Sequence, residues 1–543
     1  MYFGLPYKSK YEREDMKRTR RIAVLLCLAM MFSLIGCGKS NAGKSTGEEA
    51  SETGSGSQSQ VTDAGSGNYK KEIIIGLSNV FTTTDMQSTA SITNQIFYTV
   101  SHSTLLKWDY DTSEYVSDLA KSYTVSDDGT VFTFYLQDNA YFHNGEKVKA
   151  SDVIYTFERG KTSSATAPKV QIIKEIKALD DLTLEITLSG PSTGFLFDIT
   201  NPNMSILSEK AMNELGEEGT KIGSGAFYYD NIDFGNEVKM ARFDQYFGEM
   251  PKAETIIFRQ YSEDATRVIA LQAGDIDYCQ TPSTVDLDYI EEDPNLDLIQ
   301  MKGTRLNYMV MNVSEERGTP FTDIRVRQAV NMAINKDDVV VGAANGFGEA
   351  QNFYFTDICY GFYGGMEGYS YNIEKAKELL AEAGYPDGFS FSLLCHDSTA
   401  KAIAPILQDQ LGKIGITLNI EEVETAVRNT LIEDNDFDAC MAAHVSLVSC
   451  DNNLRLLFYT GAQNNRMKYS NEKFDTMLDG ALVEQDETKR MEMYKELQTM
   501  VVDEAICVPL YVETLNIAKK SSLQGIKLNA TGCHDFTYSY IVE

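Results

Sequence analysis

The sequence is poor in the residues on which several protein classes depend. Its 543 residues include one tryptophan, five histidines and nine widely spaced cysteines without a CxxC pair. This spacing excludes the usual structural zinc site and a small disulfide-stapled fold. Basic residues are also few, because 48 Lys and Arg stand against 79 Asp and Glu, which gives a formal net charge of −31. Such a surface repels phosphate backbones, so we expect no nucleic-acid partner.

Common hydrolytic motifs are missing as well. No HExxH occurs, and "GSGAF" at 223–227 has its serine one place too early for G-x-S-x-G. We therefore expect no catalytic residue, no metal site and no cofactor, and a protein that is not an enzyme. An exported hydrolase remains an alternative, because a serine, its base and the group that orients the base need to meet only in space.

One stretch does match a nucleotide-binding pattern. "GKSNAGKS", Gly38–Ser45, has the glycine, lysine and serine spacing of a P-loop. That loop binds phosphate only where it joins a buried strand to a helix whose N-terminus faces the anion. The residues that follow, "GEEASETGSGSQSQ", have no apolar periodicity. We interpret the match as coincidental.

The apolar run before that stretch has the features of a targeting segment. Basic residues between 17 and 21 precede 14 apolar or small residues, Ile22–Ile35, and then Gly36. This order predicts a secretory signal peptide over residues 1–36. The run is shorter than the ~20 residues that a membrane-spanning helix needs. Because an ordinary signal begins at Met16, we expect residues 1–15 to precede the true start.

The signal ends in "LIGC", Leu34–Cys37, which is similar to the lipobox of bacterial lipoproteins. The resemblance implies cleavage before Cys37 and lipidation of that cysteine. Several acyl chains give durable anchoring, so we expect a protein lipid-anchored to the cell membrane on its extracytoplasmic face. Segment 37–68 would then be the lipidated cysteine and a flexible tether, since seven glycines and seven serines lie between residues 38 and 68.

The folded part begins near Tyr69 and mixes strand and helix patterns. "GTVFTFYLQ", 129–137, alternates apolar and polar residues, with Phe132, Phe134 and Leu136 on one face. "NIEKAKELLAEAGYPDG", 372–388, predicts a helix capped by Asn372 and stopped at Gly384. No fixed repeat period joins these elements. The pattern predicts an α/β fold with antiparallel hairpins.

Several blocks carry a family resemblance. Four of them, in chain order, are Leu119–Arg159, Ile222–Tyr229, Asp264–Cys279 and Phe321–Val340. They are similar to blocks of the extracellular solute-binding proteins of family 5, which are the dipeptide-, oligopeptide- and nickel-binding components of ABC importers. The resemblance covers essentially residues 73–513.

This resemblance implies a two-lobed periplasmic-binding-protein clamshell, type II-like, with an extra α/β domain. The chain crosses between the lobes, so the lobes are discontinuous in sequence. The implied boundaries are 69–112, 220–305 and 507–543 for lobe I, 113–219 for the added domain and 306–506 for lobe II. The resemblance also implies a monomer that closes around a solute by a hinge motion and delivers it to an ABC permease with separate ATPase subunits.

The implied ligand is a peptide-like solute, but one expected anchor is missing. In peptide-binding relatives, a second-lobe strand carries a tryptophan and then an aspartate that holds the α-amine. The matching stretch, "FDACMAAHVSLVSCDNNL" at 437–454, has His444 and Leu447 at these positions, unless Asp451 serves instead. An unpaired buried ammonium costs several kcal/mol. A non-peptide solute therefore remains an alternative, either an oligosaccharide or a nickel chelate held by an imidazole, as does a surface receptor for signalling peptides.

The segments that line the cleft in the family supply the site prediction. They follow the first strand, the crossing into the second lobe and the second-lobe strand. The predicted ligand-binding residues are Asn79, Phe81, Thr82, Asn307, Tyr308, His444, Asn452 and Asn453.

Overall fold

The computed structural model describes the chain from Asn68 to Glu543 with short gaps. The described residues are 68–79, 81–110, 112, 114–163, 165–192, 194–446, 449–462, 464–484 and 486–543. The predicted signal peptide, Cys37, residues 38–67 of the tether and Leu447 lie outside these residues. Gly67–Glu543 form one compact unit of the chain.

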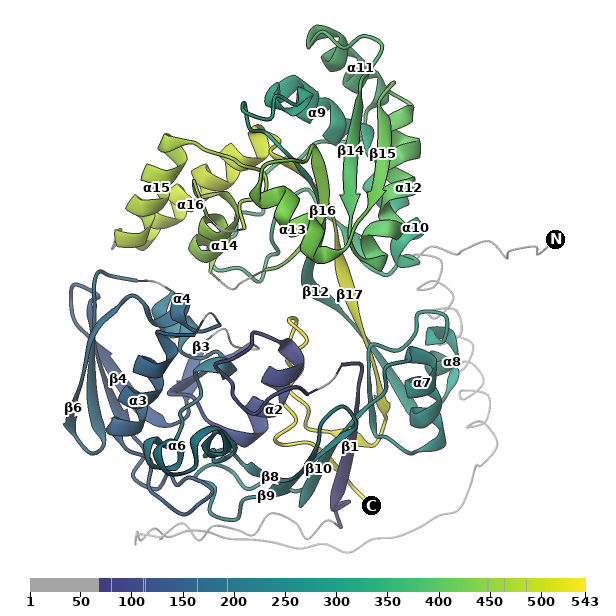
Figure 1. Cartoon of the computed structure of the whole chain (residues 1–543). Helices are drawn as coiled ribbons and strands as arrows, with labels where there is room; N and C mark the ends of the chain where they lie inside the picture. Colours follow the sequence, from purple (N-terminus) through teal and green to yellow (C-terminus); the bar gives the residue numbers. More distant parts are fainter. Residues whose placement is uncertain are drawn as a thin grey trace, which may run out of the picture. The chain divides into compact units, whose positions relative to one another are not determined.

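An 11-stranded mixed sheet runs through this unit (Figure 1). β1, which contains the buried residues Ile73 and Ile75, pairs in parallel with its neighbours β10 and β11. The strand order is β15 (Thr417–Glu422), β14 (Ser390–Cys395), β16 (Ala439–Val445), β12 (Leu296–Met311), β17 (Cys507–Lys520), β11 (Tyr278–Gln280), β1 (Glu72–Leu77), β10 (Thr255–Gln260), β9 (Glu237–Arg242) and β8 (Phe227–Asp233), and β13 (Gly348–Ala350) pairs with β17. We call the part built on β15, β14 and β16 the second lobe, and the part built on β11, β1, β10, β9 and β8 the first lobe.

Two long antiparallel strands, β12 and β17, connect the lobes (Figure 1). Residues 296–302 of β12 pair with 514–520 in the first lobe, and residues 306–310 pair with 507–512 in the second. The register shifts between Lys302 and Leu306. A Cβ atom on Gly303 would lie 2.7 Å from the backbone oxygen of Glu513. The crossing therefore needs glycine at 303, because the two backbones approach too closely for a side chain.

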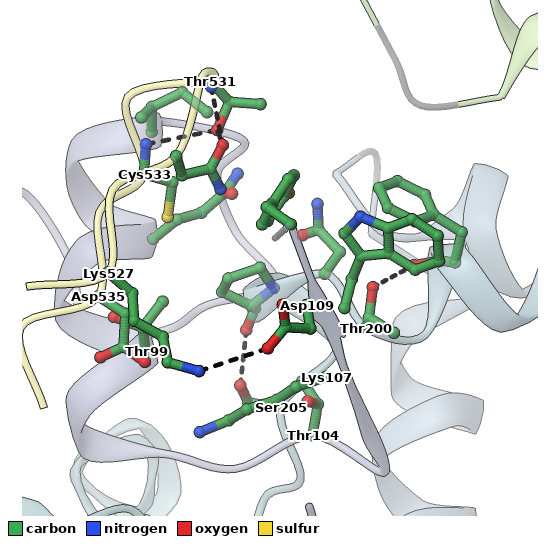
Figure 2. Close-up of a pocket in the computed structure, with 18 of the residues that line it drawn as sticks. Thr99, Thr104, Lys107, Asp109, Thr200, Ser205, Lys527, Thr531, Cys533 and Asp535 are labelled. Atoms are coloured by element: carbon green, nitrogen blue, oxygen red, sulfur yellow. Dashed lines mark hydrogen bonds and ion pairs between the residues drawn. The ribbon is translucent and has the colours of Figure 1, made fainter. Parts of the chain in front are cut away.

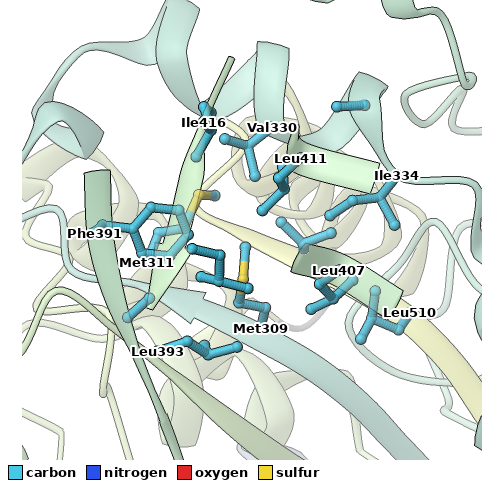
Figure 3. Close-up of a cluster of buried hydrophobic side chains, with 14 of the residues drawn as sticks. Met309, Met311, Val330, Ile334, Phe391, Leu393, Leu407, Leu411, Ile416 and Leu510 are labelled. Atoms are coloured by element: carbon cyan, nitrogen blue, oxygen red, sulfur yellow. The ribbon is translucent and has the colours of Figure 1, made fainter. Parts of the chain in front are cut away.

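Helices cover both faces of the second-lobe sheet. Side chains alternate along β12, so Met309 packs in the core on one face (Figure 3). Val310 packs in the core on the other face. Burial on both faces explains why β16, in the middle of this sheet, is apolar along most of its length. The helices on the Met309 face are α9 (Ile324–Ala333), α10 (Lys336–Ala344), α11 (Ile373–Glu382) and α12 (Ser398–Gly412), and those on the other face are α13 (Thr425–Glu433), α14 (Cys450–Phe458), α15 (Glu472–Val483) and α16 (Glu487–Asp503).

The helix predicted over 372–388 is confirmed as α11. The Asn372 side chain accepts a hydrogen bond from the Lys375 amide at 3.0 Å, which satisfies one free donor of the first turn. Beyond the helix, Gly384 has φ 93°, a conformation that favours glycine. Local capping chemistry thus fixes both ends of this helix.

A separate four-stranded antiparallel sheet forms the centre of the added domain. Phe132, Phe134 and Leu136 of its strand β5 are all buried, which confirms the predicted alternation. Their core cluster extends from Leu105 to Ile206. The sheet order is β4 (Ala120–Val125), β5 (Val131–Leu136), β7 (Thr183–Leu188) and β6 (Ile173–Asp180), and the helices are α3 (Ala150–Gly160), α4 (Ala167–Val170) and α5 (Phe195–Asp198). β2 (Leu106–Asp109) and β3 (Glu114–Ser117) form a two-stranded ribbon beside it.

The C-terminal segment returns to the first lobe. After β17 it forms a two-stranded pairing of β18 (Leu523–Gln524) with β19 (Tyr540–Ile541). The Glu543 amide donates to the Asn68 carbonyl at 2.8 Å, so the first and last described residues are neighbours. The remaining first-lobe and neighbouring helices are α2 (Ile92–Ser101), α6 (Glu209–Leu215), α7 (Asp264–Ala273) and α8 (Leu287–Glu292).

The lobe boundaries stay a prediction, and we propose one adjustment to them. Val508 packs in the second-lobe core with Met309, whereas Ile517 packs in the first-lobe core with Ile73. On these contacts, the crossing in β17 lies near Glu513 rather than at 507. In the described part of the chain, no helix is both long and apolar enough to cross a membrane.

Candidate functional site

A cavity of about 410 Å³ lies between elements of both lobes (Figure 2). Its wall is built from α2, β2, residues of segments 197–205 and 527–535, and the end of β16, where Val445 and Ser446 contribute. Ligand pockets usually enclose ~300–1,000 Å³. The cavity therefore has room for a small solute that touches both lobes.

Trp108 gives the cavity an apolar wall. β2 pairs with β3 so that Trp108 lies opposite Tyr115, and the two rings meet edge to face at 4.9 Å. Phe197 contacts the indole from the added domain at 5.7 Å, also edge to face. These contacts fix the orientation of the only tryptophan in the sequence. The indole is therefore held as a rigid surface for packing.

Lys107, another cavity residue, balances a buried carboxylate. Its Nζ lies 3.9 Å from Oδ1 of Asp118, and the second oxygen of Asp118 accepts a 2.8 Å hydrogen bond from the Thr104 amide. Burial raises the pKa of the Asp118 carboxyl, and the nearby ammonium opposes that rise. Lys107 is thus already engaged in the structure.

A second ion pair joins the cavity walls. Lys527 Nζ lies 3.6 Å from Asp109 Oδ2 (Figure 2), although the two residues are far apart in the chain. Asp109 also accepts a 3.1 Å hydrogen bond from the Thr112 amide. Mutual backbone hydrogen bonds of 3.0 Å between Lys527 and Asp535 place both side chains on the same segment of wall. The cavity therefore contains charges of both signs.

The second-lobe residues described in the wall are neutral. Ser446 is held in place, because its amide donates to the Thr304 carbonyl at 2.8 Å and its hydroxyl accepts from the Thr356 amide at 3.1 Å. Val445 precedes it on β16. The charged wall residues that the structure describes are Lys107, Asp109, Lys169, Lys527 and Asp535. They come from the first lobe, the added domain and the C-terminal segment.

The structure brings two of the predicted second-lobe residues together. His444 Nε2 lies 2.7 Å from Asn453 Oδ1, and Asn453 also donates to the Ser449 carbonyl at 2.8 Å. Burial lowers the pKa of His444 to about 4, so its imidazole is neutral near pH 7. Asn452 instead lies against the added domain, since a Cβ atom on Gly194 would be 3.3 Å from its Nδ2.

Asn307 and Tyr308 follow the crossing in β12. Asn307 donates to Glu513 Oε1 at 2.8 Å. Tyr308 packs in the second-lobe core, and its hydroxyl accepts from Arg466 at 3.3 Å. Burial raises the pKa of Tyr308 to about 12.

The three predicted first-lobe residues follow β1. Asn79 is exposed, while Phe81 is buried and stacks on Tyr229 at 5.9 Å. Thr82 exchanges two hydrogen bonds with Asn94 of α2, at 2.9 and 3.2 Å. Thr82 thus helps to hold the helix that supplies one wall of the cavity.

None of the eight predicted residues is among the described residues that line the cavity, and their contact with a ligand stays a prediction. Sequence reasoning missed Trp108, Asp109 and Lys527. The sequence could have pointed to Trp108, because it is the single tryptophan and stands between the charged residues Lys107 and Asp109. No local signal joins position 109 to position 527.

Asp451, the alternative acidic anchor, is buried in the first turn of α14. Its Oδ2 lies 3.3 Å from Arg455 Nε, and its Oδ1 has no hydrogen-bond partner among the residues that the structure describes. Burial raises the pKa of this carboxyl. Among the residues that the structure describes, no group of three or more His, Cys, Asp or Glu could hold a metal ion.

Comparisons with known proteins match most of the chain. The family model described as bacterial extracellular solute-binding proteins, family 5 Middle, matches residues 114–466. The dipeptide-binding protein of Escherichia coli K12 is 26% identical over 469 residues, which cover 80% of this chain and 87% of the relative. The glutathione-binding protein GsiB of Salmonella paratyphi A is 28% identical over 476 residues, which cover 84% of this chain and 91% of that protein.

A solved structure matches over a similar length. The periplasmic binding protein DppA of Helicobacter pylori, in complex with the peptide STSA, superposes with a TM-score of 0.74 at 25% sequence identity. The match covers 87% of this chain and 98% of that protein. This similarity confirms the predicted two-lobed α/β fold.

Proposed function

The chain belongs to the bacterial extracellular solute-binding proteins, family 5, and from this we propose that it captures a peptide-like solute and delivers it to an ABC import permease. The observation that carries the proposal is the cavity of about 410 Å³. Its wall includes β2 on one side and the end of β16, from the second lobe, on the other. Its relatives are named as dipeptide- and glutathione-binding proteins. A peptide-like solute fits this size and the mixture of apolar and charged wall residues.

The solute acts by making closure favourable. Contacts drive a hinge motion only when they are better in the closed state than in the open state. Trp108 and Ser446 reach the cavity from opposite lobes, so a solute that touches both gains its full contact area only when the lobes approach. β12 and β17 would bend near Gly303, where the ladder between them is interrupted.

We also propose that lipidation of Cys37 holds the protein on the extracytoplasmic face of the cell membrane. The support is the sequence "LIGC" after a signal-like apolar run. In this scheme the permease recognises the closed form, and separate ATPase subunits supply the energy. The binding protein itself performs no chemistry on the solute.

The solitary tryptophan offers a direct binding assay. The full chain, purified from membranes in mild detergent, is titrated with peptides of two to four residues while the emission of Trp108 is followed. We expect a saturable change and an unaltered peptide mass after long incubation. Trp108→Phe should abolish the optical signal while calorimetry still detects binding. Absence of calorimetric binding for every peptide, or cleavage of the peptide, would contradict the proposal.

Delivery and anchoring are tested separately. Cys37→Ala should release the protein from the membrane and reduce peptide uptake by intact cells, while the affinity for peptide stays unchanged. Uptake at the wild-type rate by a released protein would contradict the role of the anchor.

A further inference from the structure

We propose that Thr284 of the first lobe and Asn345 of the second form a latch behind the hinge, which opposes closure until a solute is bound. The Asn345 Nδ2 atom donates to the Thr284 hydroxyl at 3.1 Å. The inference rests on the proposed solute-binding function and concerns how the closure that serves this function is regulated. The two residues would set the affinity without touching the solute.

The order of the strands places this contact on the far side of the hinge from the cavity. β12 pairs along its outer edge with β16, whose end lines the cavity. The outer edge of β17 pairs instead with β11 at residues 517–519 and with β13 at residues 511–513. Figure 1 shows α8 and α10 to the right of the crossing strands and α2 and α14 to the left. The latch and the cavity therefore lie at opposite edges of the β12–β17 pair.

The contact spans the short gap between β11 and β13. β11 ends at Gln280 in the first lobe, and β13 begins at Gly348 in the second. Both strands run antiparallel to β17, so the loop that leaves β11 faces the loop that enters β13. Thr284 lies in the first loop and Asn345 in the second. A bend of β12 and β17 that brings the lobes together at the cavity edge spreads these two loops apart.

The first-lobe loop is held in place by a buried arginine. Arg267 is fully buried, and its guanidinium donates at 2.6 Å to the backbone oxygens of Thr281 and Tyr261. It also donates to the Thr281 hydroxyl at 3.1 Å. Thr281 has φ 44°, which is uncommon for a β-branched residue, and these hydrogen bonds stabilise that conformation. The loop that carries Thr284 therefore starts from a fixed position.

The second-lobe partner is fixed by the end of a helix. Asn345 follows α10 with φ 52°, in the left-handed region that asparagine tolerates better than most residues. Its backbone amide donates to the Val340 carbonyl of α10. Because the backbone is ordered on both sides of the contact, the hydrogen bond forms with little further loss of conformational entropy.

An apolar contact adds to the latch. Phe347, two residues after Asn345, packs against the first-lobe cluster that contains Leu271 and Ala518. Closure would draw this ring away from its first-lobe neighbours. Neither Phe347 nor the two hydrogen-bonded residues are among the described residues that line the cavity. Substitutions at these three positions therefore leave the walls that face the solute unchanged.

The sign of the effect on affinity separates a latch from a merely structural contact. A contact that stabilises the open form lowers the fraction of closed protein, and the apparent affinity falls by the same factor. One hydrogen bond of ordinary strength changes such an equilibrium roughly two- to tenfold. Removal of the latch should therefore tighten peptide binding, whereas removal of a structural contact would weaken binding or leave it unchanged.

Energy transfer between two dyes measures closure in the absence of solute. The parent protein is the full chain with Lys177→Cys on β6 and Lys473→Cys on α15, which lie in the two parts of the molecule and both to the left of the crossing strands in Figure 1. These lysine side chains are exposed, and the seven cysteines of the described residues are buried, so the dyes attach at the introduced positions. Closure should raise the transfer.

Two substitutions remove the hydrogen bond from either side. Asn345→Gly removes the amide and suits the left-handed backbone, and Thr284→Val removes the hydroxyl at nearly constant volume. Each should raise the ratio of high- to low-transfer molecules about two- to tenfold in the ligand-free protein. Phe347→Ala should shift the ratio in the same direction.

Matched variants check the assignment. Thr284→Ser retains the hydroxyl and should behave like the parent. Thr460→Val removes an exposed 3.2 Å contact between hydroxyls, to Ser470 within the second lobe, and should also leave the ratio unchanged. Thermal unfolding verifies that each variant keeps its fold, and Thr284→Val decides the question where Asn345→Gly does not fold.

Calorimetry with di-, tri- and tetra-alanine completes the test. Asn345→Gly and Thr284→Val should bind the peptides that the parent binds about two- to tenfold more tightly. Parental energy transfer in both variants, or weaker peptide binding by both, would overturn the latch and leave the solute-binding function intact. If the parent binds none of the three peptides, the proposed function is contradicted, and the energy transfer of the ligand-free proteins still decides whether the latch opposes closure.

Discussion

Asn307 on β12 donates a hydrogen bond of 2.8 Å to Glu513 on β17, at the point where both strands pass between the lobes. The same carboxylate oxygen accepts from Arg305 Nε at 3.2 Å. Arg305 lies within the register shift of β12, and Asn307 lies just beyond it. Side chains therefore join the two strands where their backbone ladder is interrupted.

Replacement of Asn307 tests how much its hydrogen bond to Glu513 contributes to the free energy of unfolding. Asn307→Ala removes a hydrogen bond to a charged acceptor and should lower the free energy of unfolding by about 2 kcal/mol. Gln300→Ala, which removes the 3.0 Å contact with Asn516 in the first-lobe half of the same strand pair, is the control and should cost about 1 kcal/mol. Urea unfolding measures both. A loss of peptide affinity with no loss of stability would instead support the predicted ligand contact of Asn307.

The close approach at Gly303 leads to a second prediction. Gly303→Ala would place a Cβ atom 2.7 Å from the Glu513 carbonyl oxygen, and relief of that contact requires movement of backbone. We expect a loss of about 1–3 kcal/mol, as for other overpacked sites, together with weaker peptide binding. Gly190→Ala is a suitable control, because no described residue beyond its two chain neighbours has a heavy atom within 4 Å of the added Cβ. An unchanged melting temperature for Gly303→Ala would show that the backbones of β12 and β17 leave room for a side chain at position 303.

His444 should make stability depend on pH. Its folded pKa of about 4 lies below the ~6.5 of an unfolded histidine, so the unfolded chain binds the proton first as the pH falls. The neutral imidazole makes its full contribution to the free energy of unfolding above about pH 6.5, and this contribution is lost progressively toward pH 4. At about pH 5 the loss in free energy of unfolding is about 2 kcal/mol.

His444→Gln is the matching variant, because its amide can still donate to Asn453 but does not titrate. Unfolding free energies near pH 7.5 and about pH 5 should show that the wild type loses more stability than the variant between the two conditions. Parallel losses in the two proteins would refute the lowered pKa.

The cysteines of the described residues should be unreactive in the native protein. All seven, Cys279 through Cys533, are buried and free. Burial raises the pKa of Cys440 and Cys533 to about 12 and that of Cys279 to about 11. Thiolate is the reactive form, so thiol reagents should label them only after unfolding. Rapid labelling of any of them in the folded protein would indicate local opening.

Local chemistry made much of the fold predictable from the sequence. The cap at Asn372, the stop at Gly384 and the alternation from Phe132 to Leu136 each depend on residues within one segment, and the structure confirms all three. The order of the family blocks then gave the two-lobed architecture. These signals lie along the chain and need no knowledge of distant contacts.

The cavity was less predictable because its walls come from distant segments. Asp109 and Lys527 meet only after β17 has returned the chain from the second lobe to the first. The predicted site used positions along single strands, such as Asn307 and His444, and the structure places these side chains in contacts with Glu513 and Asn453. The alternation along a strand predicts which residues share a face of the sheet, but it does not predict which face borders a cavity.

The neighbouring ends of the described chain have a practical consequence. The Asn68 side chain donates to Glu543 at 3.0 Å, in addition to the backbone contact between the same residues. A short linker could therefore join the two ends, and a circular permutant could be opened in the exposed turn between β8 and β9, around Gly235.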